Sequence, residues 1–376
     1  MRTFWKIFSL FLCSFQVFAA SVSIPLKQGD NSKRPAEDLV FQGQRLDSYQ
    51  ALNLAKNGVD LAKLNPYESY IWQDKKHPLK SIKVSSNQFK FEEYKRSPTE
   101  FFRAVVSQNG VRYVVTASLD NHTNIIRAAL LRKLGYDIAL PSYLKSAKID
   151  FASVAQKTEF LDKIGEQTLT NRKKWLEKET EDTSLYLRDL TIESAELKNV
   201  NIYIPVMNRE RQEKRRVFRS LLAIYALTDF PQSVNSIGDK VGRVFNNFLN
   251  ITHPYANQFR DVSKEDIKWI TDRINNTVTD SDWSEITRLA GHPTDISSLV
   301  REKLKARTNS LAEHFQMPQV FSSHTKLTTG NIVRGKLMSD AYPDRVVDYF
   351  KEDADSPYEF NELFRLFRTQ GTYNAL

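Results

Sequence analysis

The sequence predicts an α+β fold, in which a β-rich part comes first and a mostly helical part follows. Two β-rich runs, 101–106 and 111–116, flank the pair Asn109-Gly110, and an Asn-Gly pair between such runs is a strong hairpin signal. From about residue 153 onward, apolar residues recur mainly at helical spacing. Strands followed by helices are typical of the α+β class.

The predicted β-rich lobe covers residues 45–152. After the hairpin, Asp120 stands at the start of a helix-like pattern and Gly135 at its end, and these residue types are expected at a helix cap and a helix stop. The central unit of the lobe is therefore hairpin, helix, strand. The expected elements are a helix over 45–63 that is interrupted at 57–58, strands over 81–84 and 89–94, the hairpin, a helix over 120–134 and a strand over 143–151.

The predicted helical lobe covers residues 153–318, and we expect residues 319–376 to form a C-terminal hairpin and helix. Ser263 is followed three residues later by Asp266, which resembles a capping box and marks a helix start. The expected elements are helices over 154–164, 172–181, 209–227, 264–276 and 295–315, and short strands over 185–192 and 200–204.

Residues 1–20 have the order of an export signal. Basic residues precede an apolar run over 7–18, and small residues at Ala19 and Ala20 offer a cleavage site. Because a membrane-spanning helix needs about 20 apolar residues, the run predicts a removed signal peptide, with a retained anchor as the alternative. We expect residues 21–44 to form a flexible mature N-terminus and the protein to be periplasmic or secreted.

The only cysteine of the chain, Cys13, lies inside this predicted signal. A mature chain that starts near Ala20 has no cysteine, which excludes disulfides, thiolate metal sites and cysteine nucleophiles. A cysteine-free exported chain fits a bacterial periplasm better than an extracellular fluid. The alternative is a lipoprotein signal cut before Cys13, although Leu12 stands where a small residue is expected.

The charge pattern offers one candidate binding surface. The net charge is +9, and the densest basic cluster lies in the amphipathic segment 209–227. Because arginine presents a bidentate fork to phosphates, the cluster predicts contact with an anionic surface or a phosphate ligand. The alternative is the solvated polar face of a helix. The cluster consists of Arg209, Arg211, Lys214, Arg215, Arg216 and Arg219. No transmembrane segment is expected after the signal, and no specific nucleic-acid motif occurs in the sequence.

Common catalytic motifs are absent from the sequence or incomplete. Residues 330–336 match the phosphate-loop pattern, but Leu337 stands where a serine or threonine must hold magnesium, so we interpret the match as chance spacing. The sequence contains no GxGxxG dinucleotide fingerprint and no GxSxG nucleophile elbow. The six histidines lie too far apart for a two-ligand helix face.

The hairpin, helix, strand order over 101–151 resembles the small lobe of protein-kinase-like folds. It is most similar to the secreted kinase-like proteins of the spore coat protein H type, in which an aspartate and an arginine-bearing helix precede a further strand. In this sequence those features correspond to Asp120, Arg127 and the strand over 143–151. The resemblance implies that Arg127 contributes to cofactor binding.

The segment 229–235 is similar to the catalytic loop of the same superfamily, in which an aspartate serves as base and an asparagine holds metal. The resemblance implies Asp229 as the base, Asn235 and Asp239 as metal ligands, and magnesium and ATP as cofactors. The sequence departs from the family in its Asp-to-Asn spacing, which is one residue longer than usual. It also has no glycine-rich loop in the hairpin and no lysine on 111–116.

Two functions follow from these observations. The leading interpretation is an exported envelope protein of unknown activity and unknown cofactor, which acts as a binding or structural component. The alternative is a divergent kinase-like phosphotransferase that uses Asp229 and Asn235. The periplasm has no ready ATP supply, which favours the first interpretation. Convergence of Asp229, Asn235 and Asp239 in one cleft would favour the second.

Overall fold

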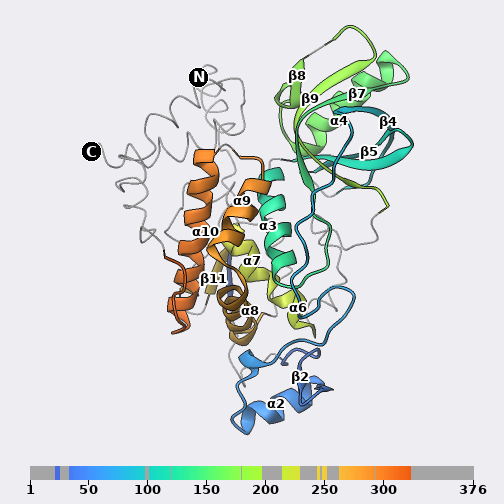
Figure 1. The fold of residues 1–376 in the computed structure, drawn as a ribbon. Helices are drawn as coiled ribbons and strands as arrows, with labels where there is room; N and C mark the ends of the chain where they lie inside the picture. The colour runs from blue at the N-terminus through green and yellow to red at the C-terminus, as the bar shows by residue number, and fades with distance from the viewer. Residues whose placement is uncertain are drawn as a thin grey trace, which may run out of the picture.

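The computed structural model of the chain has the expected α+β composition, and strands and helices occupy separate regions (Figure 1). A β-barrel lies at one end of the molecule, helices fill the middle, and a small N-terminal unit lies at the other end. The structure describes residues 22–25, 34–97, 101–118, 120–178, 180–196, 214–228, 244–245, 248–251, 262–292 and 294–322. The predicted signal peptide, the strand over 200–204 and the phosphate-loop match lie outside these residues, as does the predicted C-terminal hairpin and helix beyond residue 322.

Six strands form the main sheet, and five of them close into a barrel. The sheet order is β6-β5-β4-β7-β9-β8, and β6 also pairs with β9, which closes the ring. The pair β4–β7 is parallel and the other pairs are antiparallel. The strands are β4 (Gln88–Tyr94), β5 (Phe102–Gln108), β6 (Val111–Ala117), β7 (Ser142–Asp150), β8 (Leu176–Lys178) and β9 (Ser184–Ser194). Closure leaves few unpaired strand edges.

The barrel is filled by aromatic side chains from the strands and from helix α4 (Val154–Thr168). Phe160 of α4 is fully buried, and its ring centroid lies 4.7 Å from that of Phe102 and 5.4 Å from that of Phe91. Alternate residues of β4, β5 and β6 point to this core, as the two-residue period of a strand requires. In β7 and β9 the alternation shifts once, between Leu144 and Ala147 and between Leu187 and Leu190, where Asp189 has a positive φ. The helix begins where the Ser153 hydroxyl accepts from the amide of Gln156.

The sequence-based boundary between lobes, at 152–153, falls inside this barrel. Strand β9 pairs with β7 along nearly its whole length and with β6 at its end, where Thr116 faces Thr191. The barrel therefore continues to Ser194, because strands distant in sequence complete the ring. The predicted helix over 172–181 is also wrong, since a 3-10 turn over Arg172–Trp175 leads into β8. Buried Trp175 anchors that turn by donating to Thr170 Oγ1 over 2.9 Å.

The helical body packs around α3 (Asn121–Lys133), which lies between the barrel and the other helices (Figure 1). Helix α3 contacts α7, α9, β7 and β9. The other helices are α6 (Arg216–Arg219), α7 (Leu221–Thr228), α8 (Lys264–Thr277), α9 (Asp280–Leu289) and α10 (Thr294–His314). Among these described helices, none has the length and apolarity needed to cross a bilayer.

Two features of the helical body differ from the sequence prediction. Over the described residues 214–227, the predicted helix over 209–227 is divided into α6 and α7 at Ser220, whose amide and hydroxyl both donate to the carbonyl of Arg216, over 2.9 and 2.8 Å. Helix α9 was not predicted. It begins at a second capping box, formed by Thr279 and Asp282, and it buries Trp283.

Two small β units complete the fold. Strands β1 (Val22–Pro25), β11 (Phe248–Ile251) and β10 (Val244–Phe245) form a three-stranded antiparallel sheet. The N-terminal unit contains the hairpin β2 (Val40–Phe41) and β3 (Gln44–Arg45), helix α2 (Ser48–Lys56) and a 3-10 turn over Leu61–Lys63. The strand predicted over 81–84 does not form, although Ile82 still packs against the barrel core.

Candidate functional site

Helix α3 carries an unusual set of buried polar side chains. All of its residues over 121–131 are buried, because the barrel covers one side of the helix and α7 and α9 cover others. The polar members of this stretch are Asn121, His122, Thr123, Asn124 and Arg127. Buried polar groups require partners, so their contacts show what this helix is built to hold.

Arg127, the residue that the family resemblance implies in cofactor binding, is the last member of this set along the helix. Its side chain is 2% exposed, and its guanidinium carbon lies 4.1 Å from the centre of the Tyr225 ring on α7. Its Nε atom donates to Thr228 Oγ1 over 3.1 Å, and its Nη1 atom donates to Asn124 Oδ1 over 3.0 Å. All of these partners are neutral.

Two other arginines of comparable burial are held differently. Arg103 on β5 pairs with Glu193 on β9, and Arg216 pairs with Asp266 at 3.0 Å. Both therefore have a carboxylate that compensates for the loss of water. No ion pair of Arg127 is found among the residues that the structure describes. Arg127 is thus a buried cation held by a hydroxyl, an amide oxygen and an aromatic ring.

A buried hydrogen-bond donor lies beside this cation. Asn124 is 1% exposed, and its Oδ1 atom accepts the hydrogen bond from Arg127. Its Nδ2 atom is buried and has no hydrogen-bond partner among the described residues. Together, Asn124 Nδ2 and the Arg127 guanidinium offer donors and positive charge at one place on α3, which is the chemistry that binds an anion.

The C-terminal end of α7 lies beside the Arg127 guanidinium. Thr228 is the last described residue of that helix, and its hydroxyl also donates to the carbonyl of Ile224 over 2.7 Å. Arg307 of α10 donates to the carbonyls of Ala226 and Leu227 over 3.2 and 3.0 Å, which satisfies helix-end acceptors. Burial raises the pKa of Tyr225, so its phenol stays neutral beneath Arg127.

The other residues of the predicted catalytic site follow α7 in the sequence. Asp229, Asn235 and Asp239 lie outside the described residues, as do Arg209 and Arg211 of the basic cluster. Asp229 directly follows Thr228 in the sequence.

Sequence reasoning missed three residues of this site. Asn124 stands one helical turn before Arg127, and that spacing was a usable signal. Thr228 and Arg307 gave no local signal, because they reach the site only through the packing of α7 and α10.

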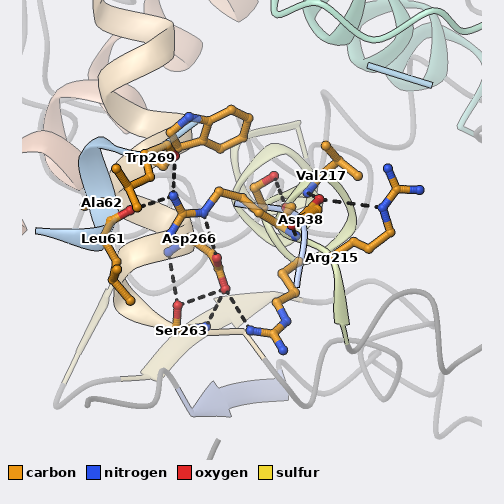
Figure 2. Close-up of polar contacts among 12 residues, drawn as sticks. Asp38, Leu61, Ala62, Arg215, Val217, Ser263, Asp266 and Trp269 are labelled. Carbon is orange, nitrogen blue, oxygen red and sulfur yellow. Dashed lines mark hydrogen bonds and ion pairs between the residues drawn. The ribbon is translucent and has the colours of Figure 1, made fainter. Parts of the chain in front are cut away.

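Three arginines of the basic cluster, Arg215, Arg216 and Arg219, lie in a second polar centre, where α6 meets α8 and the N-terminal unit (Figure 2). Lys214 of the cluster is exposed. Arg216 is 1% exposed, donates from Nε to Asp266, and donates from Nη1 to the carbonyls of Leu61 and Leu64 over 2.7 and 2.6 Å. Its guanidinium therefore points into the protein. This differs from the expected surface contact because the counter-charge, Asp266, lies on a helix distant in sequence.

Asp38 occupies the other side of this centre, as Figure 2 shows. It is fully buried and accepts the backbone amide of Arg216 over 2.7 Å, and Arg215 Nε lies 3.6 Å from its Oδ2 atom. Burial raises the pKa of Asp38, although the bond from Arg216 and the charges of both arginines oppose that rise. The centre ties three chain segments together and is a structural network.

The described residues contain no group of three or more histidine, cysteine, aspartate or glutamate side chains placed to hold a metal ion. The sequence matches no protein-family model, no curated protein and no solved structure at a significant level.

Proposed function

We propose that this chain is an exported envelope protein that binds an anionic ligand of the phosphate class where α3 meets the end of α7. The observation that supports this proposal is Arg127, a buried guanidinium whose partners are all neutral. A buried charge is costly unless an opposite charge compensates it, and a bound anion supplies that charge.

The donor geometry favours phosphate over a simple halide or an apolar ligand. A guanidinium presents its donors in a planar fork that fits the oxygens of a phosphate. The Nδ2 atom of Asn124 adds a neutral donor directly beside that fork. The Tyr225 ring contact and the bonds to Thr228 and Asn124 hold the guanidinium in place, so the side chain is preorganised and little side-chain entropy is lost on binding.

A second candidate is the kinase-like phosphotransferase. One observation favours it: Arg127 contacts Thr228, and the next residue is Asp229, the base that the resemblance implies. In this function Arg127 would hold the phosphates of ATP, Asp229 would accept the proton of the attacking hydroxyl, and Asn235 and Asp239 would hold magnesium. ATP with magnesium would supply the phosphoryl group.

Thermal shift with a panel of anions tests the proposal and separates the two candidates. Inorganic phosphate, pyrophosphate, sulfate, acetate and ATP with magnesium are each added to the mature chain. We expect pyrophosphate or phosphate to raise the melting temperature, because a ligand that binds only the folded state stabilises it. A shift with ATP and magnesium that is lost in Asp229→Asn would favour the phosphotransferase. No shift with any phosphate compound would reject both.

A further inference from the structure

A hollow lies on the N-terminal unit. This unit stands at the end of the molecule opposite the barrel (Figure 1). It has a volume of about 350 Å³, which is within the usual range for small-molecule sites. One wall comes from helix α2 and the other from the β2–β3 hairpin. The lining residues are Phe41, Gln42, Gln44, Leu46, Gln50, Asn53, Leu54 and Asn57.

The lining is rich in carboxamides and contains no charged side chain. Five of its eight residues are asparagine or glutamine, whereas charged residues make up 26% of the chain. Gln50 and Asn53 of α2 and its C-cap residue Asn57 follow the helical period, so this end of the helix presents one face of amides to the hollow. Gln42 and Gln44 stand on the facing hairpin, at its turn and in β3.

Most of these amides are available to a ligand. Among the contacts of the described residues, the side chains of Gln42, Gln44, Asn53 and Asn57 form no hydrogen bond. Gln50 uses its Oε1 atom to accept the amide of Asp47, as part of the capping box of α2, and its Nε2 atom is not used there.

Two charged residues that adjoin the lining in the sequence, Arg45 and Asp47, make contacts outside it. Arg45 donates to the carbonyl of Glu37 over 3.0 Å, and its guanidinium lies over the ring of Tyr67. Asp47 accepts the amide of Gln50 at the start of α2. The hollow therefore has no charge with which to select an ion, and its apolar residues, Phe41, Leu46 and Leu54, are a minority of its lining.

We propose that this hollow binds a short neutral oligosaccharide. Each carboxamide offers both donors and an acceptor, which is the pairing that the hydroxyl groups of a sugar require. The apolar side chains match the C–H face of a sugar ring, and the absence of charge in the lining fits a neutral ligand. This site is separate from the anion site at Arg127, because the two share no residue.

Ligand-observed saturation-transfer NMR and calorimetry on the mature chain test this proposal. The probes are triacetylchitotriose, cellotriose and maltotriose at millimolar concentration. We expect at least one of them to bind, and we expect Gln44→Ala together with Asn53→Ala to weaken that binding, by roughly fivefold for each hydrogen-bonding amide removed. Gln319→Ala, which removes an exposed amide outside the hollow, should leave binding unchanged.

The variants are chosen so that a loss of binding is not caused by unfolding of the N-terminal unit. Both substitutions replace exposed side chains, and alanine at position 53 is a better helix former than asparagine. Far-ultraviolet circular dichroism and the melting temperature check that the unit is intact. If none of the three trisaccharides transfers saturation, or if the double variant binds as the unaltered chain does, the proposal is wrong.

Discussion

The Nε atom of Arg127 on α3 donates a hydrogen bond to Oγ1 of Thr228 at the end of α7, over 3.1 Å. This contact joins the helix beside the barrel to the residue that precedes Asp229 in the sequence. Arg127 thus links α3 to the end of α7. Loss of this arginine distinguishes a role in stability from a role in ligand binding.

Loss of Arg127 should destabilise the protein far less than loss of Arg216. Arg216→Met leaves the buried Asp266 without its closest cation, which costs about 3–5 kcal/mol. Arg127→Met removes bonds to neutral groups and also removes a costly buried charge, so we expect a loss below about 2 kcal/mol. Urea denaturation of both variants measures the difference. Equal losses would show that Arg127 is only a structural residue.

The stability of the protein should fall at acid pH because of His292. This imidazole stacks on that of His122 with ring centroids 4.1 Å apart, and burial, followed by the charges of His122 and Lys303, lowers its pKa well below 6.5. The unfolded chain therefore binds a proton at His292 before the folded chain does. The free energy of unfolding is then highest above pH 6.5 and decreases as the pH falls below that value.

The variant His292→Leu separates this contribution from that of other groups. Burial also lowers the pKa of His77 and His314, so the variant should keep part of the pH dependence. Denaturation curves at several pH values give the slope of the free energy of unfolding against pH for each protein. If this slope is as steep in His292→Leu as in the unaltered chain, His292 is not a source of the loss of stability at acid pH.

The barrel should depend on Phe160. Truncation to alanine removes a fully buried ring that contacts Phe91, Phe102 and Phe151, and such changes cost about 3–5 kcal/mol. Val154→Ala, on the exposed side of the same helix, is the matched control and should cost little. Thermal unfolding measures the loss of stability in Phe160→Ala and in Val154→Ala. A loss under about 1 kcal/mol for Phe160→Ala would mean that α4 does not close the barrel core.

Export should remove the N-terminal signal. The order of charged, apolar and small residues over 1–20 predicts a mature chain that starts near Ala20 or Ser21. Intact-mass measurement on protein from its native host gives the start directly. A mass that includes Met1 would contradict export by cleavage, and a lipid-bearing start at Cys13 would support the lipoprotein alternative.

Local signals in the sequence predicted the hairpin and most helices well. The turn Asn109-Gly110 is confirmed, with φ values of 52° and 78° that match the turn favoured by twisted strands. The capping box at Ser263 and Asp266 is also confirmed. These features are encoded within a few neighbouring residues, so a pattern can reveal them.

Features that depend on distant partners were not predictable in the same way. Closure of the barrel needs β6 to pair with β9, and nothing within either strand specifies that pairing. The orientation of Arg216 depends on Asp266, which stands fifty positions further along the chain. The burial of Arg127 depends on packing by the barrel and by α7, and its sequence context gave only its place on a helix.

Calorimetric titration of pyrophosphate into the mature chain tests the central claim most directly. The account predicts binding to the unaltered chain, loss of that binding in Arg127→Met, and unchanged binding in Arg112→Met, which removes an exposed arginine paired with Glu92 and Glu93. Phosphate and sulfate, titrated in parallel, show whether the site prefers phosphate oxygens. Pyrophosphate binding of equal strength in Arg127→Met, or no binding to the unaltered chain, would contradict the account.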